Sequence, residues 1–203
     1  MPFIHKHKLL FIHIPKTGGS SIERKFNINE TPGDYTLYEE KETNINNIFY
    51  APQHLVPKLI RTKHEQLYNE YKKFTIVRNP YTRIISEYFD YYWTRVKQPI
   101  NNLDNLQKFL YDEKIMFTRD HTLPQKKYFE NIKYDYVLKF ENLNVEFSNM
   151  AKKFNFSGTL QHYNKSKTNI LTQTYIKDLN KKCIEKINTL YSEDFELLNY
   201  SFL

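Results

Sequence analysis

The fold is decided by one stretch near the start of the chain, Lys8-Leu9-Leu10-Phe11-Ile12-His13-Ile14-Pro15-Lys16-Thr17-Gly18-Gly19-Ser20-Ser21. Its first half is a short apolar run, which is typical of a β-strand buried on both faces. Its second half contains two adjacent glycines, and Ile22 and Phe26 follow at the four-residue spacing of a helix face. The stretch therefore predicts a strand, a tight turn and then a helix that begins near Ser20.

A second unit further along the chain has the same order. The run 74–77 predicts a strand, Asn79 suits a helix cap, and Pro80 suits the first helical position. The apolar and aromatic residues beyond it recur at helical spacing: Tyr81, Ile84, Ile85, Tyr88, Phe89 and Tyr92. This spacing predicts a long amphipathic helix.

A third unit follows the same pattern. The run 134–140 predicts a strand, the residues 143–154 predict a helix, and helical spacing returns in the tail from about Asp178 to Leu198. Repeated strand and helix units favour an α/β fold around a mainly parallel sheet. Ligands of such folds bind at the carboxyl ends of the strands, where Lys16 and Arg78 both fall.

The composition indicates a folded chain that favours anionic partners. The 203 residues fit a single domain spanning 1–203, and 40% hydrophobic residues with 16% aromatics suffice for a core. The excess of Lys and Arg gives a net charge of +7, which favours phosphates, acidic glycans, nucleic acid or a lipid surface. The single cysteine, Cys183, excludes an internal disulfide and a multi-thiolate zinc site. With no apolar run long enough for a membrane span and no signal-peptide core, we expect a cytoplasmic protein.

The turn after the first strand has the chemistry of an anion cradle. Gly18 and Gly19 let backbone amides approach a ligand, and the start of the helix adds partial positive charge. Lys16 supplies a full charge, and hydroxyl donors come from Thr17, Ser20 and Ser21. The alternative is a tight turn that Ser20 merely caps. Because the lysine precedes the glycines, the pattern is not that of a nucleotide-triphosphatase loop, and it demands no metal.

The second unit offers another group of phosphate ligands. Arg78 follows its strand and can grip a phosphate with two parallel hydrogen bonds, and Ser86, two turns into the helix, can donate from the same side. For Arg83 and Glu87 the spacing of four residues predicts an ordinary surface ion pair.

At these two motifs the sequence resembles the sulfotransferases that use 3′-phosphoadenosine 5′-phosphosulfate (PAPS), especially their carbohydrate branch. The resemblance identifies Pro15 to Ser21 as the 5′-phosphosulfate loop, and Arg78 and Ser86 as ligands of the 3′-phosphate. It extends in order through 121–125, 136–143 and 191–197. It implies a P-loop-like three-layer fold, with a mainly parallel central sheet flanked by helices, and transfer of a sulfuryl group from PAPS without a metal.

The resemblance also suggests a late loop and a base. The run 161–167 resembles the loop that closes on the donor, so Ser166 and Lys167 are expected at the 3′-phosphate, unless this is only a solvated basic loop. His54 lies where related enzymes often place a catalytic histidine, and an ordinary histidine accepts a proton near pH 7. Its alternative role is a helix cap, and either Glu23 or Glu42 is the alternative base. For His13 we expect a core or loop-supporting role.

The sequence leaves other functions open. The residues His121 and Gln125 can belong to the site or only to a turn. A nucleotide-dependent kinase of related fold is one alternative to sulfuryl transfer, and magnesium dependence would separate the two. A basic nucleic-acid-binding module is the other, although the aromatic residues recur at core spacing. The expected acceptor is a carbohydrate or another hydroxyl-bearing molecule, and the net charge favours a partly anionic one. The regions 27–47 and 98–119 are expected to set the choice of acceptor.

Overall fold

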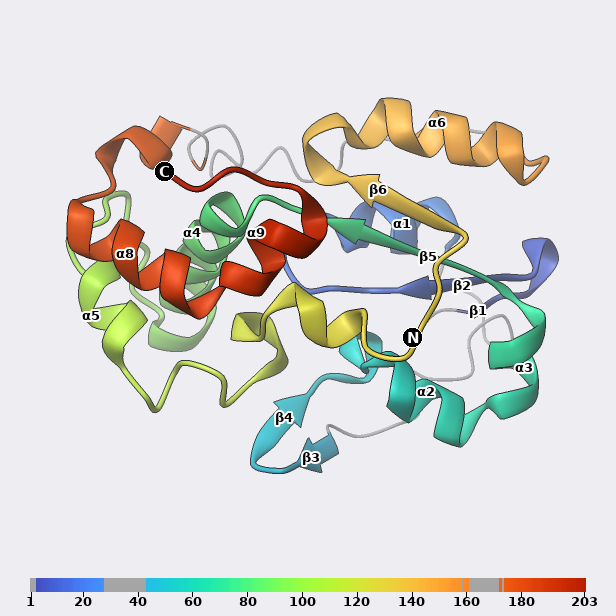
Figure 1. Cartoon of the computed structure of the whole chain (residues 1–203), viewed down its shortest axis with the longest axis horizontal. Helices are drawn as coiled ribbons and strands as arrows, with labels where there is room; N and C mark the ends of the chain where they lie inside the picture. Colours follow the sequence, from blue (N-terminus) through green and yellow to red (C-terminus); the bar gives the residue numbers. More distant parts are fainter. Residues whose placement is uncertain (1–2, 28–42, 158, 161–171, 173) are drawn as a thin grey trace.

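The computed structural model describes residues 3–27, 43–157, 159–160, 172 and 174–203 (Figure 1). Its centre is a four-stranded sheet in the order β1-β2-β5-β6. The strands span Phe3–Ile4 (β1), Leu9–Ile12 (β2), Lys72–Val77 (β5) and Tyr136–Lys139 (β6). Strands β2, β5 and β6 run parallel, and only β1 is antiparallel to its neighbour. The expected mainly parallel α/β sheet is therefore confirmed.

The sheet is buried on both faces, which explains the unbroken apolar run in β2. All four residues of β2 are inaccessible to solvent, and Phe11 stacks on Phe74 of β5 with ring centroids 5.0 Å apart. Residues Leu9 and Phe11 pack into the core on one face, and Leu10 and Ile12 pack into the core on the other. Each face therefore needs its own cover of helices.

Helices cover both faces and complete three layers (Figure 1). One face packs against α1 (Gly19–Lys25) and α6 (Leu143–Lys153), through residues such as Ile22 and Phe147. The opposite face packs against α2 (Pro57–Lys63), α3 (Glu65–Glu70), the 3₁₀ turn η5 (Gln125–Tyr128) and α9 (Ser192–Leu198). These elements contribute Ile60, Tyr68, Tyr128 and Leu198 to the core, and Leu55 joins them from just before α2.

The helix after β5 begins as its sequence predicts. Asn79 caps α4 (Pro80–Tyr91) by accepting a hydrogen bond from the amide of Tyr81, at 2.9 Å. The helix then passes into a π-helical turn, η3 (Tyr92–Val96). Its apolar side packs against α5 (Leu106–Tyr111) and α8 (Lys181–Leu190) in a separate core cluster. Helix α4 thus stands between this cluster and the end of the sheet.

The tail differs from the sequence prediction. The expected helical tail is two helices, α8 and α9, because Tyr191 leaves the helical conformation with φ −125° and its hydroxyl donates to the carbonyl of Thr122. The last residues of the region 27–47 start a hairpin, β3 (Thr43–Ile45) and β4 (Ile48–Tyr50). The remaining short turns are η1 (His5–His7), η2 (Pro52–His54), η4 (Asp120–Thr122), η6 (Phe140–Asn142) and η7 (Tyr175–Asp178).

Among the described residues, none of the helices has the length and apolar character needed to cross a bilayer.

Candidate active site

The loop between β2 and α1 turns sharply at two residues. Lys16 and Gly18 both have positive φ, 66° and 89°, and the amide of Ser21 donates to the carbonyl of Gly18. The side chain of Thr17 is fully buried, and its hydroxyl donates to the carbonyl of Ile14 at 2.8 Å. Thr17 therefore holds the loop in shape, whereas Ser20 and Ser21 remain half-buried at the start of α1.

The glycine at position 19 is required by the ring behind it. A Cβ atom built on Gly19 would lie 2.1 Å from Nε2 of His13, and a Cβ on Gly18 would lie 2.9 Å from the ring of Phe140. No side chain fits at either position without moving its neighbours. The turn is thus packed directly against an imidazole, which agrees with the loop-supporting role expected for His13.

Arg78 joins the two motifs. Its Nη1 donates to the carbonyl of Lys16 at 3.0 Å, its Nε donates to the hydroxyl of Thr82 at 3.0 Å, and its Nη2 donates to the hydroxyl of Thr172 at 2.9 Å. The guanidinium also lies over the ring of Phe140, 4.2 Å from the centroid. The first loop and the second unit therefore meet at this one side chain.

The charge of Arg78 is buried against neutral groups. The residue is only 2% exposed, and no carboxylate forms an ion pair with it among the residues that the structure describes. Burial lowers the pKa of Arg78 to about 10, although the charge of Glu141 acts in the opposite direction. A buried cation without an opposite charge is costly, so an anion that reaches this guanidinium will be strongly favoured.

A line of polar residues on α4 connects Arg78 with Lys16. The residues Thr82, Ser86 and Asp90 are spaced by four and therefore lie along one side of the helix. Thr82 accepts from Arg78 at one end, and Asp90 pairs with the ammonium of Lys16 at the other, Oδ1 to Nζ 3.2 Å. The half-buried Ser86 lies between them. This line brings together three of the residues that the sequence assigned to the donor.

The expected surface pair of Arg83 and Glu87 is wrong. Both residues are only 1% exposed, because α4 is enclosed on nearly every side. The guanidinium of Arg83 donates to the carbonyls of Pro15, His121 and Leu123. Arg83 thus ties the loop after β2 to the segment that carries His121.

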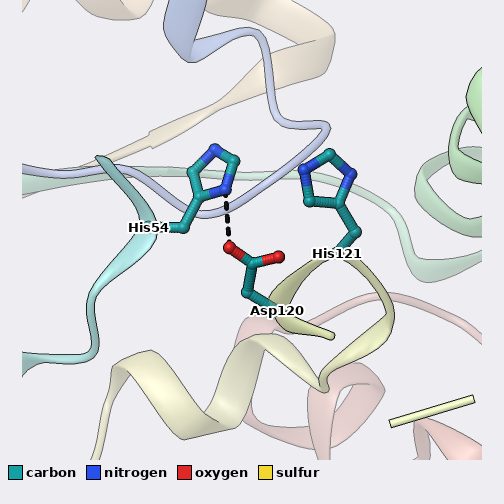
Figure 2. A group of neighbouring side chains, drawn as sticks. All are labelled: His54, Asp120 and His121. Atoms are coloured by element: carbon teal, nitrogen blue, oxygen red, sulfur yellow. Dashed lines mark hydrogen bonds and ion pairs between the residues drawn. The ribbon is translucent and has the colours of Figure 1, made fainter. Parts of the chain in front are cut away.

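His54 forms a buried pair with an aspartate that the sequence did not indicate. Its Nδ1 lies 2.9 Å from Oδ2 of Asp120, which also accepts from the amide of Ala51 (Figure 2). Burial lowers the pKa of His54 to about 3, which outweighs the hydrogen bond to Asp120 that acts to raise this pKa. For Asp120, burial acts to raise the pKa, but the hydrogen bond and charge of His54 outweigh it, so the pKa of Asp120 is lowered. Neutral His54 thus donates from Nδ1 and keeps the lone pair of Nε2 for a proton.

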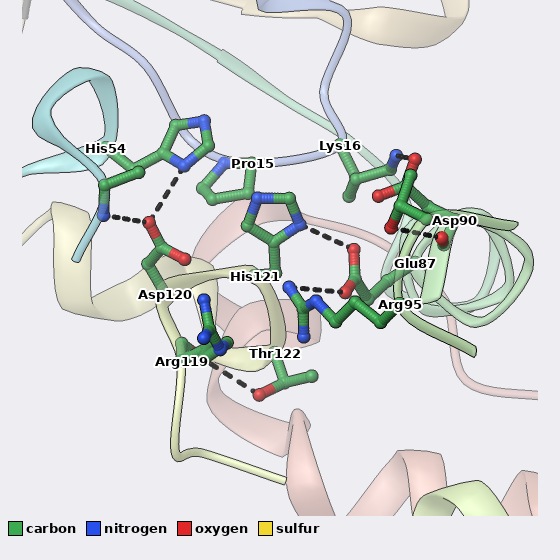
Figure 3. A network of polar contacts seen from close by, with 12 residues as sticks. Pro15, Lys16, His54, Glu87, Asp90, Arg95, Arg119, Asp120, His121 and Thr122 are labelled. Atoms are coloured by element: carbon green, nitrogen blue, oxygen red, sulfur yellow. Dashed lines mark hydrogen bonds and ion pairs between the residues drawn. The ribbon is translucent and has the colours of Figure 1, made fainter. Parts of the chain in front are cut away.

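Two more histidines with carboxylate partners flank His54. On one side His13 pairs with the buried Glu23, Nδ1 to Oε1 2.8 Å, and its ring centroid lies 4.6 Å from that of His54. On the other side His121 pairs with Glu87, Nδ1 to Oε2 2.7 Å, and its ring centroid lies 5.0 Å from that of His54. Glu23 is therefore engaged as the partner of His13. Figure 3 shows two of these rings, His54 and His121, near Pro15 and Lys16 of the loop.

Other predicted residues lie elsewhere. Gln125 is fully buried and exchanges two hydrogen bonds with the backbone of Arg78, so it positions the end of β5. Ser166, Lys167 and Glu42 lie outside the described residues.

The groups missed by the sequence are the hydrogen-bond partners. Asp120 and His54 are separated by 66 positions and Arg78 and Thr172 by 94, so spacing within one element carries no sign of these pairs. Only Asp90 had a signal, because it continues the four-residue spacing of Thr82 and Ser86.

The carboxylates and histidines come close enough to suggest metal ligands, but they already have partners. Two groups have ligand atoms within 4.8 Å of one another: His54 with Asp120 and His121, and His121 with Glu87 and Asp90. Within these groups Asp90 pairs with Lys16, and Glu87 pairs with His121 and with Arg95 at 3.6 Å. We therefore derive no metal chemistry from this site.

The comparison with known families agrees with this geometry. A family model described as the sulfotransferase family matches residues 3–201, nearly the whole chain. The chain belongs to the sulfotransferase family. Curated proteins and solved structures give no match. For a sulfotransferase, the loop, the buried arginine and the histidine pairs described above form the natural candidate for the active site.

Proposed function

We propose that this sulfotransferase transfers a sulfuryl group from PAPS to a hydroxyl of a carbohydrate or another small acceptor. The observation that carries the proposal is the meeting of Lys16 and Arg78, 62 positions apart, through a direct hydrogen bond. A donor with a phosphate at each end of its ribose needs two cationic grips on one side of the protein. Residues 1–203 would then act as a single catalytic domain.

The donor is assigned to the loop and to α4. Its 5′-phosphosulfate would be held by Lys16, by the amides of Gly18 and Gly19, and by Ser20 and Ser21 at the start of α1. The buried charge of Arg78 and the neighbouring hydroxyl of Ser86 would hold the 3′-phosphate. Ser166 and Lys167 remain further candidates for the same phosphate.

Sulfuryl transfer would proceed by in-line displacement. As the bond between sulfur and the bridging oxygen breaks, negative charge grows on that oxygen, and the ammonium of Lys16 would stabilise it. The acceptor hydroxyl loses its proton as its oxygen attacks sulfur. Nε2 of His54 is the proposed base, held in the correct tautomer by Asp120 at 2.9 Å.

The acceptor is assigned by class only. The net charge of +7 favours a partly anionic saccharide over a neutral one. Arg95 and Arg119 accompany His121 in the same network (Figure 3), so positive charge is present beside the proposed reaction centre. The single buried cysteine fits work in the cytoplasm.

Two measurements test the proposal. Titration calorimetry of the full chain with adenosine 3′,5′-bisphosphate is expected to give saturable binding, at one site per chain, that magnesium does not alter. Incubation with radiolabelled PAPS and a panel of neutral and uronic-acid-containing oligosaccharides is expected to label at least one oligosaccharide. Absence of bisphosphate binding would contradict the proposal, as would binding that requires magnesium, since that would favour a kinase.

A further inference from the structure

His121 lies between the two functional groups that the proposed reaction uses. Its ligand atom is within 4.8 Å of those of Glu87 and Asp90, and Asp90 in turn pairs with Lys16. On its other side, His121 forms an equally close group with His54 and Asp120. The rings of His54 and His121 are in edge contact, with centroids 5.0 Å apart, and Figure 3 shows Pro15 of the loop near them.

Both His54 and His121 use the same ring nitrogen to contact a carboxylate. Nδ1 of His54 faces Asp120 and Nδ1 of His121 faces Glu87, so in each ring Nε2 is the nitrogen that remains for a substrate. The side chain of His121 is 20% exposed, whereas that of His54 is 6% exposed. His121 is therefore the ring that an incoming group meets first.

Two carboxylates of α4 lie close to His121. Helix α4 presents two carboxylates to it, Glu87 at 2.7 Å and Asp90 within 4.8 Å. The cations that face these carboxylates are Lys16, on Asp90, and Arg95, on Glu87 at a longer distance of 3.6 Å. Carboxylates at this distance can stabilise a positive charge on an imidazole ring.

The charges around His54 favour its neutral form. It has a single carboxylate partner, Asp120, and its ring is enclosed by two other imidazoles, His13 and His121. Burial lowers the pKa of His54 to about 3, and the neighbouring imidazoles act in the same direction. Two neighbouring imidazoles, one held neutral by burial and one placed beside carboxylates, are suited to base and donor roles in one reaction.

We propose that His121 is a second catalytic residue, which carries a proton on Nε2 and donates it in a hydrogen bond to the sulfuryl group as that group moves. In the step, the acceptor oxygen forms a bond to sulfur and the bond from sulfur to the bridging oxygen breaks, its electron pair staying on that oxygen. The hydroxyl proton goes to Nε2 of His54, and His121 keeps its own proton. The inference rests on the proposed sulfuryl transfer and divides the base and donor roles between two histidines.

The test is nitrogen-15 NMR of the imidazole rings in the full chain, with signals assigned by His54→Gln and His121→Gln. At the pH of the activity assay, we expect both nitrogens of the His121 ring to carry protons, whereas His54 stays in its Nδ1-protonated neutral form. In Glu87→Gln we expect the His121 ring to lose one of these protons, with His54 changed much less. His7→Gln is the matched control, because His7 lies before β2, at the opposite end of the sheet from the loop.

Activity provides the second readout. For an acceptor labelled in the oligosaccharide panel, we expect His121→Phe to slow turnover by about 100-fold and His121→Gln, which keeps a donor amide, to recover about 10-fold of that loss. The affinity for adenosine 3′,5′-bisphosphate should change less than threefold in both. The assignment is overturned if His121 is neutral at the pH of the assay, or if His121→Phe and His121→Gln slow the enzyme equally. Lack of bisphosphate binding by the wild-type chain would instead contradict the proposed function, whatever the ring signals show.

Discussion

Nη1 of Arg78 donates a 3.0 Å hydrogen bond to the carbonyl of Lys16 and so joins two segments separated by 62 positions. The bond uses the backbone of Lys16, which leaves the ammonium of that residue at the far side of the loop, against Asp90. One strand end therefore fixes the shape of the neighbouring loop, while both positive charges remain at the same edge of the sheet.

Loss of the guanidinium should weaken donor binding. We expect Arg78→Ala to reduce the affinity for adenosine 3′,5′-bisphosphate by about 2 kcal/mol or more, because a charge-assisted contact is removed from a buried site. Titration calorimetry measures the change. Arg61→Ala is the control, since Arg61 forms only an exposed pair with Glu65, and it should bind as the wild type does. Equal affinities for both variants would remove Arg78 from the donor site.

The ion pair of Lys16 with Asp90 should compete with the donor. The two side chains are 19% and 31% exposed, so their pair is worth roughly 0.3–1 kcal/mol. We expect Asp90→Asn to tighten binding of the bisphosphate by about two- to fivefold at low salt, and less at high salt. Weaker binding by Asp90→Asn would contradict this competition.

Lys16→Ala should chiefly slow turnover, because the ammonium is proposed to stabilise the leaving oxygen. A normal rate for Lys16→Ala would contradict the assignment.

Because Gly19 packs against His13, substitutions at these two positions should have non-additive effects on the free energy of unfolding. Gly19→Ala is expected to cost about 1–3 kcal/mol of unfolding free energy, because the new methyl group would overlap the imidazole at 2.1 Å. Adding His13→Ala should recover part of this loss. Urea denaturation of the single and double variants measures the coupling, and strictly additive effects would show that the overlap is relieved elsewhere.

The pair of His54 and Asp120 should control the rate without changing donor affinity. We expect His54→Ala to slow turnover by about 10²- to 10⁴-fold, because the base is removed. Asp120→Asn should also slow it, since an amide can donate to Nδ1 and so place the proton on Nε2, the wrong nitrogen. Rates are measured at saturating PAPS, with calorimetry to verify that the bisphosphate still binds. Near-normal turnover of His54→Ala would move the base to a carboxylate.

Burial of His54 should make stability depend on pH. Its pKa in the folded protein is about 3, against 6.5 in an ordinary environment. Between these values the unfolded chain takes up a proton that the folded chain does not, so the free energy of unfolding falls as the pH falls, by at most about 1.4 kcal/mol per unit from this group. Urea denaturation from pH 7 to about 4.5, above most carboxyl titration, should give a shallower slope for His54→Gln. Identical slopes would contradict the neutral buried state.

The sheet and its helices were predictable from sequence because burial on both faces requires continuous apolar strands. The runs at β2, β5 and β6 have this character, and the Asn-Pro start of α4 is an ordinary capping signal. The break at Tyr191 was not predictable, because the surrounding residues keep helical spacing and only a tertiary contact, from its hydroxyl to Thr122, accompanies the change.

The site was predictable only where its residues lie within one motif. The rule that residues four apart interact on a helix assumes an exposed face, and it failed for Arg83 and Glu87 because α4 is enclosed by the sheet end and by α5 and α8. The carboxylate partners of His54 and His121 come from segments 66 and 34 positions away. Such pairs arise from the packing of η2, η4 and α4, which no local pattern encodes.

The four-residue spacing of Thr82, Ser86 and Asp90 makes the length of α4 determine the distance and relative orientation of the two ends of the site. At 1.5 Å per residue, about 12 Å separate Thr82 from Asp90 along the axis, and a single inserted residue between them would rotate one end by about 100° relative to the other. Insertions or deletions in this helix would therefore abolish activity even where they left the sheet intact. Changes of acceptor preference are then expected to evolve through the length of surrounding segments, while the length of α4 stays constant.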